Sequence, residues 1–294
     1  MSRVRYSVQI AKSCFRTWLN GPRMLILMGM VACLTIMYAM PFAENARVQG
    51  EALHVTEVFT AVMNWRFTLL LFSTAILLMF GNIPIIDEFT GNALIKGTRK
   101  CWIAGQMLYI VCAALVFTAF IFLISVAVCL PNVKFDGEWS RPVRLLATSR
   151  RIAISPERMK LPFPDALVDM YSPWQAFGHG FGLFVLMGCF YGMASLALRM
   201  KCKSAGFIML LAINTLSWAM GMFTLDMDAY AILAVISPHY HTSLNMHTGT
   251  VVNAMLPGLG ASYAILAGMA VLLAILSLVI VRKYDYVQAE VEHV

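Results

Sequence analysis

The sequence predicts an all-α membrane protein with six transmembrane helices, an amphipathic helix before the first and a short cytoplasmic helix between the second and third. Two observations carry this prediction. Sixty percent of the residues are hydrophobic and 13% are charged, which is typical of membrane proteins and not of soluble ones. In addition, six apolar stretches contain no Asp, Glu, Lys or Arg, and each has the roughly twenty residues that cross about 30 Å of hydrocarbon as a helix. The predicted spans are 24–43, 67–86, 102–130, 175–197, 204–225 and 258–281.

Residues 1–23 precede the first span and have a helical pattern of their own. Apolar residues recur at three- and four-residue steps, and basic residues occupy a neighbouring face. The apolar set is Val4, Val8, Ala11, Phe15, Trp18 and Leu19, and the polar set is Arg5, Gln9, Lys12 and Arg16. This pattern is typical of a helix that lies in the interface plane against anionic headgroups. An ordinary surface helix is the alternative.

Basic residues gather in the connections that would lie on one side of the membrane. They occur in the N-terminal segment, at 96–100 between the second and third spans, at 199–203 between the fourth and fifth, and at 282–283. The positive-inside rule makes this side cytoplasmic. Both termini are then inside, with 282–294 as a tail, and the outer loops are 44–66, 131–174 and 226–257. We expect one integral domain in a bacterial plasma membrane.

The second outer loop does not fit the positive-inside rule. It is rich in basic residues, namely Lys134, Arg141, Arg144, Arg150, Arg151, Arg158 and Lys160. Long loops follow the rule less strictly than short ones, and the short connections elsewhere fix an even number of spans. The prediction of six spans therefore stands.

Two pairs of small residues in the spans favour close helix packing. Gly188 and Gly192 are four residues apart in the fourth span, and Ala264 and Gly268 have the same spacing in the sixth. Small residues at this spacing let helix backbones approach one another. The pairs support a packed bundle and carry no information about substrate.

The spans lack the residues that most membrane chemistry needs. Ion-coupled carriers and proton pumps place ionisable residues in the membrane, but only His179 could titrate at depth here, and a lone histidine is more often a packing residue. Sequence motifs of intramembrane enzymes are absent. The nearest approach to a nucleotide-binding loop has Lys96 before its second glycine, Gly97, and not after it. We therefore expect no catalytic residues, no cofactor in this chain and no binding of nucleic acid.

Three histidines in the third outer loop form the one metal-like pattern. His239 and His241 are one residue apart and His247 follows them. Imidazole is a common zinc ligand, but no nearby cysteine completes a tetrahedral set. Hydrogen bonding is the preferred interpretation, and a metal site is the weaker one.

The connection between the second and third spans carries the strongest local signal. It begins with Asp87 and Glu88, which favour a helix N-terminus, and Gly97 is a plausible terminator. Between them lies a short apolar centre, residues 93–95. A short helix of this kind is suited to docking a partner below the membrane, and an ordinary inter-span loop is an equally good interpretation of the local pattern.

This connection resembles that of the permease subunits of type-two ABC transporters, which have a six-span exporter fold. Many bacterial members have an acidic–aromatic pair, a glycine, an Asn-containing stretch and then a Gly-x-Ser/Thr-Arg pattern. The corresponding positions are Glu88, Phe89, Gly91, Asn92, Gly97 and Arg99, with only approximate spacing because Arg99 directly follows Thr98. The N-terminal helix resembles the connecting helix of this family. The stretch around Ser237–Tyr240 resembles the place where such permeases have short re-entrant helices.

The resemblance implies a division of labour between chains. A separate cytoplasmic ATPase dimer would bind ATP and Mg²⁺, and two permease chains, identical or paired, would form the pathway. Residues 87–100 would act as the coupling helix that passes closure of the ATPase to the second and third spans. The cargo would be hydrophobic or amphipathic, such as a peptide, lipid or drug. The long loop 131–174 has no counterpart in minimal members of the family.

Two other functions stay open at this point. The chain could be a non-transport membrane protein, a sensory or assembly partner that uses the basic loop 131–174. A channel or ion-driven carrier is the third possibility, and the uncharged spans disfavour it.

Overall fold

The computed structural model describes residues 3–86, 98–148, 163–219, 227–248 and 256–284, and it is mostly helical. Four helices are long and apolar enough to cross a membrane. They are α2 (Pro22–Gln49), α6 (Arg99–Cys129), α9 (Pro173–Cys202) and α13 (Leu259–Ile280), which continues into the 3₁₀ turn η4 (Val281–Lys283). They contain the predicted first, third, fourth and sixth spans.

The other two predicted spans have a different form. The second corresponds to α4 (Arg66–Met79), which meets α3 (Glu57–Asn64) at an angle of 86°. Counting this bent pair as one span gives five. The fifth corresponds to α10 (Ser204–Ala219), a helix of 16 residues whose predicted continuation, 220–225, lies outside the described residues. Six spans therefore remain a prediction.

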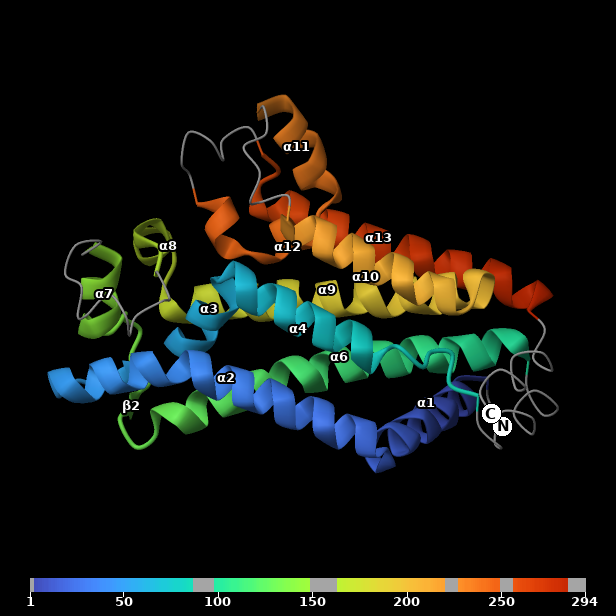
Figure 1. Ribbon diagram of the computed structural model, residues 1–294, viewed down its shortest axis with the longest axis horizontal. Helices are drawn as coiled ribbons and strands as arrows, with labels where there is room; N and C mark the ends of the chain where they lie inside the picture. Colours follow the sequence, from blue (N-terminus) through green and yellow to red (C-terminus); the bar gives the residue numbers. More distant parts are fainter. Residues whose placement is uncertain (1–2, 87–97, 149–162, 220–226, 249–255, 285–294) are drawn as a thin grey trace.

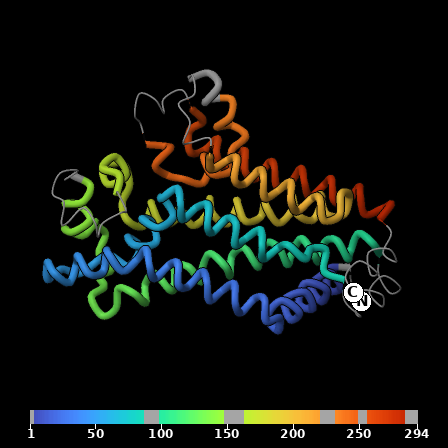
Figure 2. The backbone as a smooth tube through the Cα atoms, in the orientation of Figure 1, coloured from blue at the N-terminus to red at the C-terminus, as the bar shows by residue number. Residues whose placement is uncertain are grey.

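The long helices lie side by side along one common direction (Figure 1). α13 and α10 pack on α9, and α6 lies between α9 and α2, while α1 (Arg3–Asn20) packs along the first half of α6. The smooth trace in Figure 2 follows the chain from end to end of this bundle. The starts of α1 and α6 lie at the same end as the junction of α9 with α10 and the end of α13 (Figure 1). We call this the basic end, because the predicted cytoplasmic clusters of Lys and Arg are there.

The opposite end, which we call the capped end, carries a small layer of short elements. β1 (Leu53–His54) pairs in parallel with β2 (Val133–Lys134), and α7 (Arg141–Thr148) and α8 (Asp165–Met170) lie beside them, next to α3 (Figure 1). The third predicted outer loop forms α11 (Met227–Ile236), α12 (Pro238–Thr242) and the 3₁₀ turn η2 (Leu244–His247). The described part of this predicted loop is thus helical, and its resemblance to re-entrant helices stays a prediction. Their depth in a membrane remains a prediction.

Local sequence signals set several helix limits. Gly50 ends α2 in the left-handed conformation, with φ of 66°, which glycine adopts without steric cost. Ser172 begins α9: its hydroxyl accepts from the backbone N–H of Gln175, while the Gln175 side chain accepts from the N–H of Ser172. This reciprocal capping, followed by Pro173, satisfies N–H groups that the first turn leaves unpaired.

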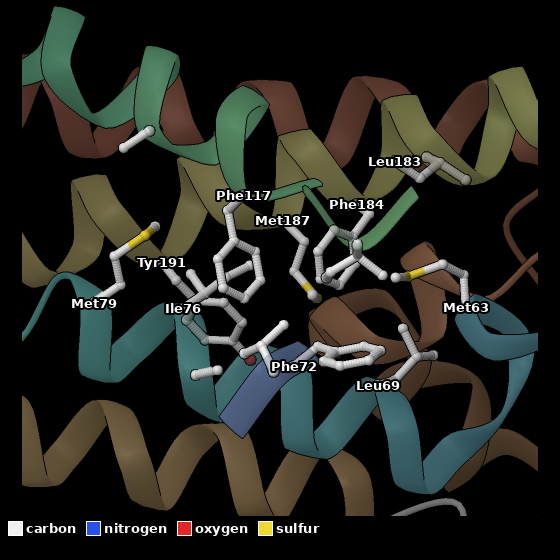
Figure 3. Packing of buried hydrophobic residues seen from close by; sticks show 14 of the residues in the cluster. Met63, Leu69, Phe72, Ile76, Met79, Phe117, Leu183, Phe184, Met187 and Tyr191 are labelled. Atoms are coloured by element: carbon white, nitrogen blue, oxygen red, sulfur yellow. The ribbon is translucent and has the colours of Figure 1, made fainter. Parts of the chain in front are cut away.

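Aromatic and sulfur side chains fill the centre of the bundle between α4, α6 and α9 (Figure 3). Phe117 of α6 stacks on Phe184 of α9 with ring centroids 6.4 Å apart, and Phe72 of α4 meets the same ring edge-on at 6.5 Å. The α6–α9 contact is close because of Gly188 and Gly192. A Cβ at Gly188 would lie 2.9 Å from the Cβ of Ala114, and one at Gly192 would lie 2.3 Å from Cγ2 of Ile110. At Gly268 a Cβ would meet nothing within 4 Å.

α1 uses its apolar residues in two ways. Ala11 and Trp18 are buried against α6, and Ile10 lies over Gly105, where an added Cβ would come within 2.6 Å of the Ile10 Cβ. Val4 and Leu19, by contrast, are 74% and 67% exposed. The predicted apolar stripe is therefore divided between α6 and the surface. The position of α1 in an interface plane remains a prediction.

Candidate functional site

The predicted coupling segment enters the described structure only at its end. Glu88, Phe89, Gly91, Asn92 and Gly97 lie outside the described residues, and Arg99 is the first residue of α6. The candidate site is therefore built from the residues that hold the two ends of segment 87–97 at the basic end of the bundle.

A glutamine of α6 holds the chain just before the segment. The buried Gln106 donates from Nε2 to the carbonyl oxygen of Ile85 at 2.9 Å and accepts from the Ile85 N–H at 3.3 Å. Ile85 lies in the non-helical stretch that follows α4, where its backbone groups have no helix partners. The side-chain amide of Gln106 pairs with both the N–H and the C=O of Ile85, and it thereby ties the chain after α4 to the second turn of α6.

An arginine at the start of α2 holds the same exit from the other side. Arg23 donates from Nη1 to Oδ1 of Asn82 at 2.6 Å and from Nη2 to the carbonyl oxygen of Leu78 at 2.9 Å. Leu78 is in the last turn of α4, and its carbonyl oxygen also accepts from the N–H of Gly81 at 3.2 Å. The guanidinium therefore adds a side-chain donor at the C-terminal end of this helix. A cavity of about 420 Å³ lies between this arginine, the turn from α1 to α2 and residues 82–86.

The chain is held again immediately after the segment. The hydroxyl of Thr98 accepts from the N–H of Cys101 at 3.3 Å and so caps α6. Arg99 donates from Nη1 to the carbonyl oxygen of Arg282 in η4 at 2.8 Å. Ser7 of α1 donates to the carbonyl oxygen of Cys101 at 3.0 Å. The start of α6 is thus bonded to both α1 and η4.

A second cavity opens at this point. It has a volume of about 690 Å³ and lies between the start of α1, the beginning of α6 and the turn η4. Its polar wall includes the side chains of Arg99, Lys100 and Arg282, all exposed. Cationic side chains and the N-terminal end of α6 together make this a place that favours negative charge.

The three histidines of the third predicted outer loop make hydrogen bonds to protein. His239 lies between Oγ of Ser217 at 2.9 Å from Nδ1 and Oγ of Ser73 at 3.0 Å from Nε2. His241 lies between Oγ of Ser262 and the carbonyl oxygen of Val235, both at 2.8 Å. His247 contacts the His241 carbonyl oxygen at 3.3 Å from Nε2.

These histidines join helices and do not gather around one point. The serines that His239 contacts belong to α4 and α10, and the serine that His241 contacts belongs to α13. Within the described ranges, no group of three or more His, Cys, Asp or Glu could hold a metal ion. His179 is likewise a packing residue, with Nδ1 at 3.3 Å from the hydroxyl of Tyr263.

A buried carboxylate joins the elements of the capped end. Glu57, fully buried, accepts from the N–H of His54 at 2.8 Å and from the N–H of Ser140. His54 in turn lies 2.8 Å from Oγ1 of Thr56, which donates to the carbonyl oxygen of Pro173 at 3.1 Å. Desolvation raises the pKa of Glu57 to about 7, against the opposing effect of the two N–H donors and of Lys134.

The basic residues described in the long outer loop are paired locally. Lys134 lies 2.6 Å from Asp136, Arg144 lies 2.8 Å from Glu138, and Arg141 lies 3.7 Å from Glu51 of the first outer loop. All three pairs are partly or largely exposed, so each contributes little to stability. They neutralise part of the charge that departs from the positive-inside rule.

No local sequence pattern indicates the side chains that hold the residues on either side of the segment. Gln106 lies in a predicted span that has no charged residues. An amide among apolar residues indicates a buried hydrogen bond, but a search for charged residues does not detect it. Arg23 belongs to the basic N-terminal segment, and a basic residue there gives no indication of a contact with α4. Ser7 and Asn82 carry no signal, because their roles depend on contacts between helices distant in sequence.

The chain matches no protein-family model, no curated protein and no solved structure.

Proposed function

We propose that this chain is the transmembrane permease subunit of an ABC exporter. A separate cytoplasmic ATPase dimer, which binds ATP and Mg²⁺, would supply the energy. A second permease chain, identical or paired, would complete the pathway. The basic end would face the cytoplasm of a bacterial cell, and the cargo would be a hydrophobic or amphipathic molecule such as a peptide, lipid or drug.

One observation carries the proposal furthest: the described residues on both sides of segment 87–97 are bonded to the bundle. Gln106 holds the chain at Ile85, and Thr98, Arg99 and Ser7 fix the start of α6. A partner that moved the segment would therefore displace α4 and α6 together, with α1 and η4 attached. Coupling in this sense means that the bundle has two arrangements and that the partner binds one of them more tightly, which shifts the equilibrium toward it.

The alternatives have less support. The hypothesis of a sensory or assembly partner depended on the charge of loop 131–174, and the described basic residues of that loop have carboxylate neighbours. A channel or ion-driven carrier stays disfavoured for the reason given by the sequence, the absence of charged residues from the predicted spans.

The proposal is tested by purifying the chain from its native membranes and assaying the preparation for an ATPase with Walker motifs. We expect such an ATPase to co-purify and its ATP hydrolysis to respond to reconstitution of the complex into vesicles. Replacement of residues 87–97 by a Gly/Ser sequence of equal length should abolish the association. If the ATPase stays bound and active with the replaced segment, the coupling hypothesis is wrong.

Gln106→Leu separates coupling from binding. The substitution leaves the Ile85 N–H and C=O without partners, at a cost of about 1–3 kcal/mol, and it releases α4 from α6. We expect the ATPase to remain bound while vesicle-dependent stimulation of its hydrolysis falls severalfold. Asn214→Leu is the matched control. Asn214 is also a buried amide, and its Nδ2 donates to Oγ1 of Thr74 at 3.0 Å, away from the segment. This substitution should leave the stimulation of ATP hydrolysis unchanged.

A further inference from the structure

The cavity at the start of α6 has a size and chemistry of its own. Its volume of about 690 Å³ is within the range of small-molecule sites, roughly 300–1,000 Å³. Three chain segments that are far apart in the sequence line it: the beginning of α1, the first two turns of α6 with Thr98, and η4. The site therefore exists only in the folded bundle.

The charged wall of the cavity is cationic. Lys100 and Arg282 enter it from α6 and η4, and neither forms an ion pair with a carboxylate of the described residues. Arg99 stands beside them, with one nitrogen committed to the Arg282 carbonyl oxygen. The capped N-terminus of α6, with Thr98 and Cys101 in the lining, adds the positive end of a helix of 31 residues. These groups together favour a phosphate.

The remaining wall is apolar and continues onto the outer surface of the bundle. Val4, Ala104 and Val281 line it. Val4 is 74% exposed and Val8, one helical turn further along α1, is 49% exposed. A ligand that fits both walls has an anionic phosphate at one end and an apolar chain at the other.

We propose that this cavity binds the phosphate headgroup of an anionic phospholipid, with an acyl chain along the exposed apolar side of α1. The inference does not depend on the ATPase: it concerns a lipid held at the basic end of the bundle. A basic pocket between helices on the cytoplasmic side of a membrane is suited to such a headgroup. The bound lipid would join α1, α6 and η4 at the place where the coupling segment ends.

Native mass spectrometry of the purified full chain, titrated with dioleoylphosphatidylglycerol, tests the proposal. We expect one lipid to bind at low concentration, dioleoylphosphatidylcholine to bind at least about tenfold more weakly, and the double substitution Lys100→Gln with Arg282→Gln to weaken phosphatidylglycerol binding about tenfold or more. The charge-preserving pair Lys100→Arg with Arg282→Lys should keep binding, which separates loss of charge from loss of folding.

The matched control removes the same charge elsewhere at the basic end. Lys201→Gln with Lys203→Gln lies outside the cavity and should change the affinity less than about twofold. Inorganic phosphate forms the third arm, and at millimolar concentration it should not displace the lipid. Equal binding of the two lipids, an equal loss with the Lys201/Lys203 pair, or displacement by phosphate alone would each overturn the lipid site.

Discussion

At the scale of residues, Gly188 and Gly192 of α9 decide how closely α6 and α9 approach. Gly192 has Ile110 where its side chain would be, whereas Gly178, on the same helix, has nothing within 4 Å of an added Cβ. The predicted role of the first small pair in packing rests on such contacts. At Gly268, in the second pair, an added Cβ would meet nothing within 4 Å, so the predicted role of that glycine in close packing has no such contact among the described residues.

Gly192→Ala and Gly178→Ala should therefore act in opposite directions. The first forces a methyl group against Ile110 and should destabilise the bundle by about 1–3 kcal/mol. The second removes a glycine from an open helix position and should be neutral or stabilising by up to about 1 kcal/mol. Thermal unfolding of the two variants in one detergent measures the difference, and equal effects would refute the close packing of α6 on α9.

At the scale of elements, Glu57 connects the layer of the capped end to the bundle. Its carboxylate bonds the N–H groups of β1 and of the residue before α7, and Thr56 beside it bonds the start of α9. We place this group outside the spanning segments, because α3 turns away from α4 by 86°. Its raised pKa makes the layer sensitive to pH.

Glu57→Gln should change how the stability of the chain depends on pH. The native pKa of Glu57 is about 7, against 4.5 for the unfolded group. The folded state therefore binds the proton more tightly, and the stability that Glu57 contributes falls as pH rises from 4.5 to 7. The fall amounts to about 3 kcal/mol. The melting temperature of the variant minus that of the native chain should accordingly rise between pH 5 and pH 8.

Subtracting the melting temperature of the native chain from that of the variant separates the effect of Glu57 from the effects of its titratable neighbours. His54, Lys134 and Asp136 lie around it, and the lowered pKa of His54, which burial causes, would change native stability in the opposite sense. These groups are common to both chains. Trp139, which donates to the Tyr171 carbonyl oxygen at 2.7 Å in the capped end, supplies a fluorescence signal. Glu44→Gln, which removes the charge of an exposed carboxylate of α2, is the charge-matched control.

Comparison of the predicted spans with the helices shows which parts of the fold can be predicted from the sequence. Helices stand at the apolar stretches, because apolarity over twenty residues is a strong local signal. The second predicted span extends to residue 86, but α4 ends at Met79, where Gly81 and Pro84 follow and break the helix. A count of charges does not detect that break. The Gln106 contact with Ile85 and the junction at Glu57 depend on tertiary contacts, which no local pattern contains.

At the scale of the whole molecule, the start of α6, the junction of α9 with α10 and η4 lie at one end of the bundle (Figure 1), and they carry the basic residues of 99–100, 199–203 and 282–283. Short connections at this end account for the agreement with the positive-inside pattern. The described basic residues of the long outer loop, Lys134, Arg141 and Arg144, lie at the other end, and each has a carboxylate neighbour. The orientation of this bundle in a membrane can be measured directly.

Cysteine labelling of intact cells should place the two ends on opposite sides of the membrane. In a chain whose own cysteines are replaced, Asp165→Cys at the capped end should react with an impermeant maleimide. Lys201→Cys at the basic end should react only after permeabilisation. Labelling of both positions in intact cells, or the reverse pattern, would contradict the proposed orientation.

The central claim is that a partner ATPase docks on segment 87–97, and photo-crosslinking from Asn92 tests it most directly. A photoreactive amino acid at position 92, in cells that make the full chain, should form a crosslink to a protein with Walker motifs. The same amino acid at Asp165, at the capped end, should not. A folded, membrane-inserted chain that gives no crosslink from position 92 to any nucleotide-binding protein would contradict the account.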